Sequence, residues 1–84
     1  MARDEKDVSS LRLVRTTLTK RGFDTTRADV RVSHGVCYIK GLVSPMKGVS
    51  FSDIRIEMEQ VRQILRQKQG IRDVMVDCTY PGNS

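Results

Sequence analysis

The chain has 84 residues, which allows one domain with a single modest core. Hydrophobic residues make up 38% and charged residues 30%, a balance that excludes a disordered chain and fits a small soluble domain. The net charge of +5 favours acidic partners such as anionic lipid or nucleic acid, although excess charge also serves ordinary solubility. No apolar run approaches the roughly 18–20 residues needed to cross a bilayer, so no transmembrane segment is predicted.

The N-terminal segment, residues 1–7, predicts a disordered lead-in that is too acidic and too polar for a secretion signal. As it stands, the chain is expected in the cytoplasm. If a leader has been removed, the periplasm or the cell envelope is expected instead.

A first helix is predicted from Val8 to Arg21. Apolar residues recur there at spacings of three and four, which is the pattern of a helix with one buried face. Asp7 can cap its N-terminus, and Gly22 can take the left-handed position that ends it.

Residues 30–43 predict a β-hairpin. Two alternating runs meet at His34 and Gly35, where glycine supplies the positive φ of a tight turn. One face of the pair is apolar, which predicts that a further element covers it.

A longer loop, residues 44–53, leads to a second helix that begins near Ser52 or Asp53 and is closed by Gly70. A third strand is predicted from Ile71 to Tyr80, and residues 81–84 form a flexible tail. The single domain therefore spans residues 8–80.

The element order is α-β-β-α-β. We predict an α+β two-layer sandwich, in which a three-stranded sheet is covered on one face by two helices. The third strand could lie beside the second, giving a mixed sheet, or beside the first, giving an antiparallel one. The local pattern does not choose between these two arrangements.

The hairpin at residues 30–43, with glycines at 35 and 41, and the glycine-led strand at residues 70–76 resemble the two signatures of the BON domain, the bacterial osmotic-shock and nodulation family. The resemblance covers residues 7–80. It implies a non-catalytic module that tethers its host protein to phospholipid surfaces or to envelope and protein partners. The loop before the second helix is longer than the family pattern.

The BON family has no common set of binding residues, so a contact site must come from the sequence itself. Apolar side chains of the loop beside nearby cations suit an anionic membrane interface or a partner groove. These residues are Lys40, Met46, Lys47, Val49 and Phe51. A purely structural role, in which Val49 and Phe51 cover the end of the core, is the alternative.

Two other functions fit less well. The element order is also that of KH-like nucleic-acid-binding domains, but the chain has no Gly-x-x-Gly loop and no aromatic pair for base stacking, which argues against specific recognition. Self-association as a structural module is possible through the sheet, where Tyr38 and Met75 are predicted to face outward.

No catalytic constellation is visible, so the sequence predicts a protein that is not an enzyme and needs no cofactor. The one histidine, His34, is at a turn. The two cysteines, Cys37 and Cys78, are predicted to be buried thiols, so no metal site is predicted.

Overall fold

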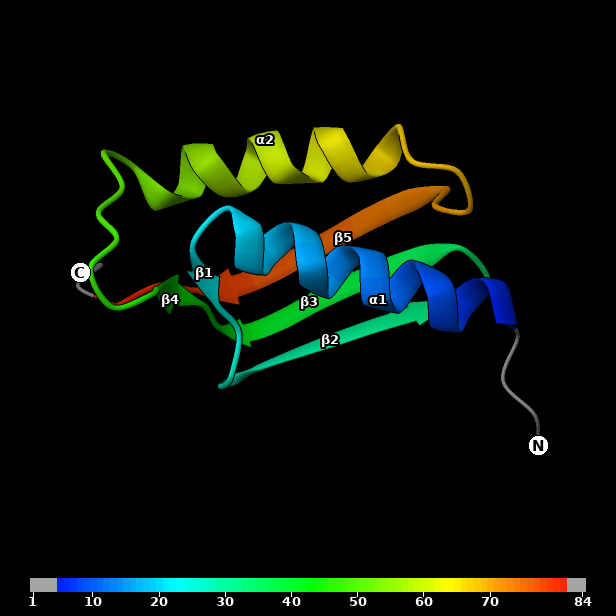
Figure 1. Ribbon diagram of the computed structural model, residues 1–84, viewed down its shortest axis with the longest axis horizontal. Coiled ribbons are helices and arrows are strands. Elements are labelled where there is room, and N and C mark those ends of the chain that lie inside the picture. The colour runs from blue at the N-terminus through cyan, green and yellow to red at the C-terminus, as the bar shows by residue number, and fades with distance from the viewer. Residues whose placement is uncertain (1–4, 82–84) are drawn as a thin grey trace.

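The computed structural model describes residues 5–81, with side chains from Val8 onward, and contains two helices and five strands over that range (Figure 1). In chain order they are α1 Glu5–Lys20, β1 Phe23–Asp24, β2 Ala28–Ser33, β3 Val36–Leu42, β4 Ser44–Pro45, α2 Ile54–Arg66 and β5 Asp73–Thr79. Leaving aside the two-residue strands β1 and β4, the order is the predicted α-β-β-α-β.

The main sheet has the strand order β2-β3-β5. β2 and β3 are antiparallel, and β5 lies parallel to β3. The sheet is therefore mixed, and α2 forms the crossover between two parallel strands. This settles the strand order that the sequence left open, and it makes β5 an edge strand.

The predicted hairpin turn is confirmed at His34 and Gly35. Both residues have positive φ, 52° and 82° respectively. Two successive left-handed residues match the right-handed twist of the flanking strands, which is why short hairpin turns favour this geometry. The turn sets the register in which Ser33 is paired with Val36.

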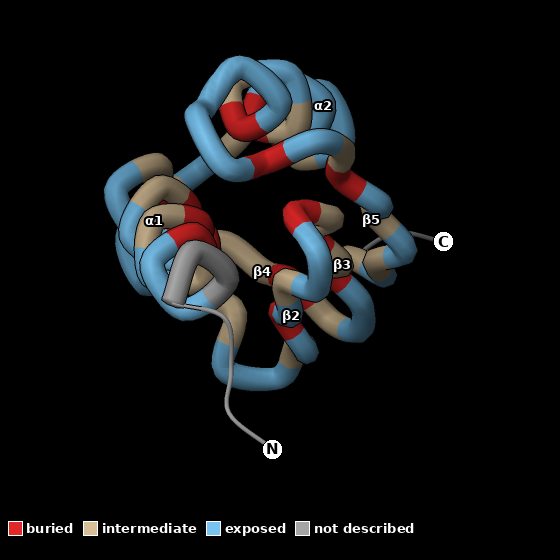
Figure 2. The backbone as a smooth tube through the Cα atoms, turned by 90° about the vertical axis from the view of Figure 1, so that its right-hand side faces the viewer, coloured by how far each residue is buried: buried red, intermediate tan, exposed pale blue. Residues whose placement is uncertain are grey.

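Both helices cover the same face of the sheet, as predicted, with α1 packed over β2 and α2 over β5 (Figure 1). Figure 2 shows the buried positions of the helices turned toward the sheet. Side chains from the two helices, the main sheet and the segments beside them form one core, which is mostly aliphatic. Its burial is the main contribution to the stability of the fold. Its buried members are Val14, Leu18, Phe23, Val30, Cys37, Ile39, Val43, Met58, Val61, Leu65, Ile71 and Val74.

The helix ends differ slightly from the predictions. α1 begins at Glu5, so the expected cap at Asp7 falls inside the helix, and residues 1–4 lie outside the described part of the chain. Asp53 caps α2 as predicted, because its side chain accepts a hydrogen bond from the Arg55 backbone N–H at 3.0 Å. α2 ends at Arg66 with Gln67 as its C-cap, before the predicted stop at Gly70.

The segment predicted as one loop, residues 44–53, begins with a strand. β4 pairs antiparallel with β1, with Phe23 opposite Pro45. The Met46 N–H also donates to the Gly22 carbonyl at 2.8 Å. Two-residue strands carry no periodicity of their own, so this second small sheet is visible only once the two segments are brought together.

Candidate functional site

Two of the five predicted contact residues close the core. Phe51 stacks on the buried Phe23, with ring centroids 4.9 Å apart. Val49 packs against the α1 terminus, because a Cβ placed on Gly22 would lie 2.8 Å from a Val49 methyl. These contacts give both side chains the structural role that was the alternative in the sequence analysis.

The other three predicted contact residues do not gather with them. Lys40 is on the open sheet face, between Asp29 of β2 and Asp77 of β5. Met46 is half-buried and Lys47 is exposed, both after β4. As a contact surface, the five residues stay a prediction.

A groove of about 400 Å³ lies between α2 and β5. Its residues come from the side of α2 that faces β5, from β5 itself and from the C-terminal end of the described chain: Arg55, Met58, Glu59, Arg62, Val74, Met75, Val76 and Tyr80. A second hollow of about 430 Å³ shares Arg55 and Tyr80 with it and continues to Pro45 and Phe51. The two hollows therefore adjoin at one end of α2.

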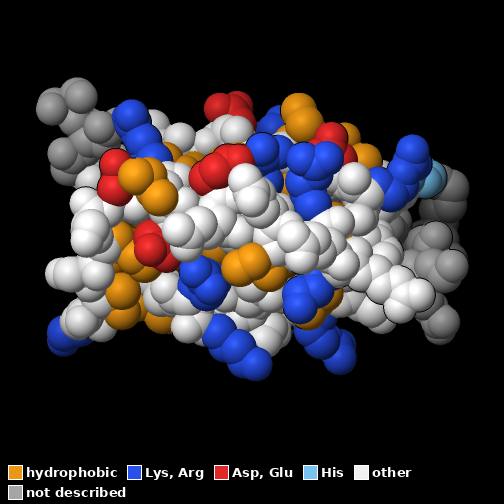
Figure 3. Space-filling model, turned by 90° about the horizontal axis from the view of Figure 1, so that it is seen from above, with side chains coloured by type: hydrophobic (Ala, Val, Ile, Leu, Met, Phe, Trp, Pro, Cys, Tyr) orange, Lys and Arg blue, Asp and Glu red, His pale blue; other side chains and the backbone are white. Residues whose placement is uncertain are grey.

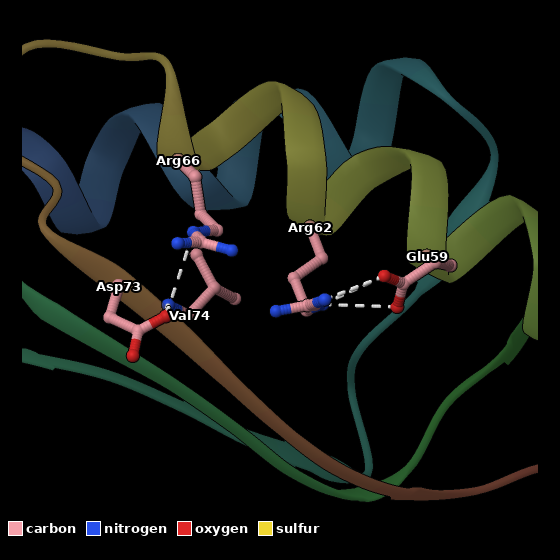
Figure 4. Close-up of polar contacts among 5 residues, drawn as sticks. All are labelled: Glu59, Arg62, Arg66, Asp73 and Val74. Carbon is pink, nitrogen blue, oxygen red and sulfur yellow. Dashed lines mark hydrogen bonds and ion pairs between the residues drawn. The ribbon is translucent and has the colours of Figure 1, made fainter.

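Two arginines of α2 reach down toward β5 in this region (Figure 4). Arg62 holds Glu59 with an ion pair of 2.7 Å, and the two side chains share further hydrogen bonds near 3 Å. Arg66 lies 3.7 Å from the Asp73 carboxylate. Hydrogen bonding from Arg62 lowers the pKa of the Glu59 carboxyl, so the carboxylate stays charged at neutral pH.

Cations and carboxylates also alternate over the outer side of the molecule that carries α2. Figure 3 shows this view, with hydrophobic side chains between the charges. The groove was not among the sites predicted from the sequence. Two signals could have pointed to it, the three arginines of α2 (Arg55, Arg62 and Arg66) and the alternating apolar residues of β5, but nothing in the local pattern places these two elements side by side.

The two cysteines are free thiols that are poorly suited to react or bind metal. Burial raises the pKa of Cys37 to about 11, and burial is also the main cause of the raised pKa of Cys78. A neutral thiol is neither a strong nucleophile nor a good ligand. Among the side chains that the structure describes, from Val8 to Pro81, no group of three or more His, Cys, Asp and Glu residues could hold a metal ion.

No helix within the described residues is both long enough and apolar enough to cross a membrane.

No protein-family model matches the sequence, and no curated protein matches it in a sequence search. A comparison with solved structures finds a likeness to the metal-bound C-terminal domain of the CzcD transporter from Thermotoga maritima. The match has a TM-score of 0.54 at 17% sequence identity, and covers 99% of this chain and 98% of that domain. At this identity the likeness establishes a shared fold.

The predicted resemblance to the BON domain is wrong. No family model supports it, and the full-length structural likeness is to a transporter domain. The two signatures at residues 30–43 and 70–76 misled because they follow from the fold: a tight hairpin requires glycine, and so does the exit from a helix into a strand.

The predicted functions are corrected as well. Tethering to phospholipid or to an envelope partner was implied by the BON resemblance, KH-like nucleic-acid binding by the element order, and self-assembly as a structural module by the exposed side of the sheet. The structural likeness over nearly the whole chain is instead to the C-terminal domain of a transporter. Fold alone does not select among the functions that it can support.

Proposed function

We propose that this chain is a non-catalytic accessory domain that acts with a membrane transporter of metal cations. The observation that carries the proposal is the full-length likeness to the C-terminal domain of CzcD, which leaves almost no part of either chain unmatched. Because that domain is metal-bound, metal cations are the transported class that we select.

The chemistry of the described residues agrees with a role without catalysis. The two thiols are held neutral by burial, and the described carboxylates are on strand faces and helix surfaces and not in an enclosed pocket. Such a domain acts through its surfaces, on a partner protein.

The proposal does not give one copy of this chain a metal site, because the donor side chains in residues 8–81 do not form a group that could hold an ion. We expect no tight Zn²⁺ binding by the purified chain in isothermal titration calorimetry, with any dissociation constant weaker than roughly 10 µM. Tight binding at one ion per chain would contradict this part of the proposal.

The cellular role is tested by deleting the gene in its native host and measuring growth in Zn²⁺, Co²⁺ and Cd²⁺. We expect lower tolerance of at least one cation, restored by a complementing copy but not by one carrying Phe23→Ala, which is expected to be strongly destabilised. Crosslinking of the tagged chain in native membranes should recover a cation transporter. Unchanged tolerance together with no transporter among the crosslinked proteins would overturn the proposal.

A further inference from the structure

We propose that an extended acidic peptide of a partner protein adds as a strand to the free edge of β5, in the groove beside α2. This inference depends on the geometry of the groove and not on the transporter role, so either can fail alone.

The backbone of β5 has a defined outer side. The Val43 N–H donates to the Thr79 carbonyl at 3.0 Å. The backbone N–H and C=O groups of Thr79, and of every second residue before it in β5, therefore face β3. The Val74 N–H instead donates to its neighbour Asp73, at 2.8 Å, as expected for a group that points away from β3. By this alternation, Val76 and Cys78 turn their N–H and C=O groups outward.

In the described part of the chain β5 pairs only with β3, so its outer groups are available to a new strand. The groove lies beside this edge. It touches Met75, which points to the open sheet face, and also Val74 and Val76, which point to the helices. A hollow that contacts both faces of one strand must pass along its edge.

The other wall of the groove selects the peptide chemistry. Alternate residues of an added strand would point toward α2, where they meet Arg55, Arg62 and the buried Met58, with the Glu59 carboxylate paired to Arg62 on the same wall. Among the side chains of residues 8–81, that of Arg55 makes no ion pair, whereas Arg62 is held by Glu59. Carboxylates at the helix-facing positions complement these cations, and Arg55 is the stronger attraction of the two.

The open-face positions of the added strand favour different residues. These positions lie near Met75 and Asp77, two residues of β5 that point to the open sheet face. The Asp77 carboxylate would repel a further carboxylate there. Uncharged β-branched residues such as threonine suit these positions. The expected ligand therefore alternates acidic and β-branched residues, in the manner of other peptides that extend a sheet.

A second copy of this chain is a poorer occupant of the same edge. Pairing β5 with β5 about a two-fold axis normal to the sheet would set the two α2 helices side by side. Arg55 and Arg62 of one copy would then face those of the other, which costs electrostatic repulsion.

The probe is a fluorescein-labelled peptide of eight residues that alternates Thr and Glu, and fluorescence anisotropy measures its binding to the full chain. We expect a dissociation constant on the order of 100 µM at low salt. A matched peptide with Gln in place of Glu should bind roughly three- to tenfold more weakly. Equal binding of the two peptides, or no binding of the acidic one at millimolar concentration, overturns the proposal.

Variants of the chain separate the two walls of the groove. Arg55→Gln should weaken binding about two- to fivefold, whereas Arg12→Gln, which removes an exposed charge from α1, should change it less than about twofold. Val76→Pro removes an outward N–H without breaking the ladder to β3, and should weaken binding by about fivefold or more. Circular dichroism checks that each variant is folded.

Amide hydrogen exchange gives an independent readout that needs no variant. In the free chain the amides of Met75 and Asp77 should be protected while those of Val76 and Cys78 exchange fast. The acidic peptide should protect Val76 and Cys78. If these two amides instead become protected without peptide as the chain concentration rises, the edge is occupied by a second copy and the proposal is wrong.

Discussion

The end of the domain near Phe51 and the groove beside β5 differ in what fills them. At the first, side chains from the 46–53 loop fold onto the core, and Phe51 stacks on Phe23. At the second, arginines of α2 stand over an edge strand and leave a hollow of about 400 Å³. From the sequence, the predicted contact surface was at the loop and did not include the groove beside β5.

The difference shows that apolar side chains in a loop are a weak sign of an exposed binding surface. Phe51 contacts Phe23 of β1 and Val49 contacts Gly22, which lies between α1 and β1, far away in sequence. The groove, in contrast, owes its shape to the backbone of an edge strand, which no side-chain pattern reveals. Four predictions test how far stability depends on the core, on the end of the domain near Phe51 and on the groove beside β5.

The largest expected effect is at the closed end. Phe23→Ala removes a side chain that is only 1% exposed, and should lower the free energy of unfolding by about 3–5 kcal/mol. The matched change in the groove, Met75→Ala, removes a side chain that is 53% exposed and should cost less than about 1 kcal/mol. Urea unfolding followed by circular dichroism measures both. Equal losses would mean that the groove is as structural as the closed end.

The second prediction concerns the two cysteines, Cys37 on the middle strand β3 and Cys78 on the edge strand β5. The Cys37 thiol, with a pKa raised from 9.0 to about 11, stays neutral in the folded chain while the unfolded chain ionises. The contribution of Cys37 to the free energy of unfolding is therefore complete below pH 9 and is lost as the pH rises through 11. The total loss is about 2–3 kcal/mol.

Unfolding curves at pH 8, 9, 10 and 11 test this loss. Cys37→Ala should make the decline between pH 9 and 11 less steep, although the raised pKa values of Cys78 and Tyr80 add declines of the same sign that persist in the variant. The same slope in both proteins would refute the assignment to Cys37. The half-buried Cys78 should also react faster than Cys37 with a thiol reagent at pH 8.

A smaller effect is expected at the junction of α1 and the loop. Gly22 has φ of 89°, and an added Cβ would lie 2.8 Å from a Val49 methyl. Gly22→Ala should therefore cost about 1–2 kcal/mol in thermal or urea unfolding. Adding Val49→Ala should recover the part due to the contact and not the part due to backbone strain. A double variant with no recovery would show that Val49 does not pack against this glycine.

The smallest effect is expected from the charges at the groove. Glu59→Gln removes the partner of Arg62, but the ion pair is partly exposed to solvent at the groove, so the midpoint of urea unfolding at pH 7 should not change measurably. The lowered pKa of Glu59 means that its contribution is present at neutral pH and is lost as the pH falls through the acidic range. A clear loss of stability at pH 7 would make this pair structural.

Much of the architecture could be predicted from local patterns. The hairpin turn at His34 and Gly35, the cap at Asp53 and the buried face of α2 each depend on residues close together in the chain. The pairing of β1 with β4 and the stacking of Phe51 on Phe23 could not be predicted, because they join segments that carry no mutual signal. The family assignment failed for a related reason, since its signatures describe the fold and not a function.

The sequence by itself determined the order and type of the main elements and their apolar faces, since hydrophobic periodicity and glycine positions act within a few residues. Only the tertiary structure decided that β5 lies beside β3 at the edge of the sheet, with α2 along it. That choice depends on how whole faces pack together, because both strand orders bury the same apolar residues. The groove exists because of that packing.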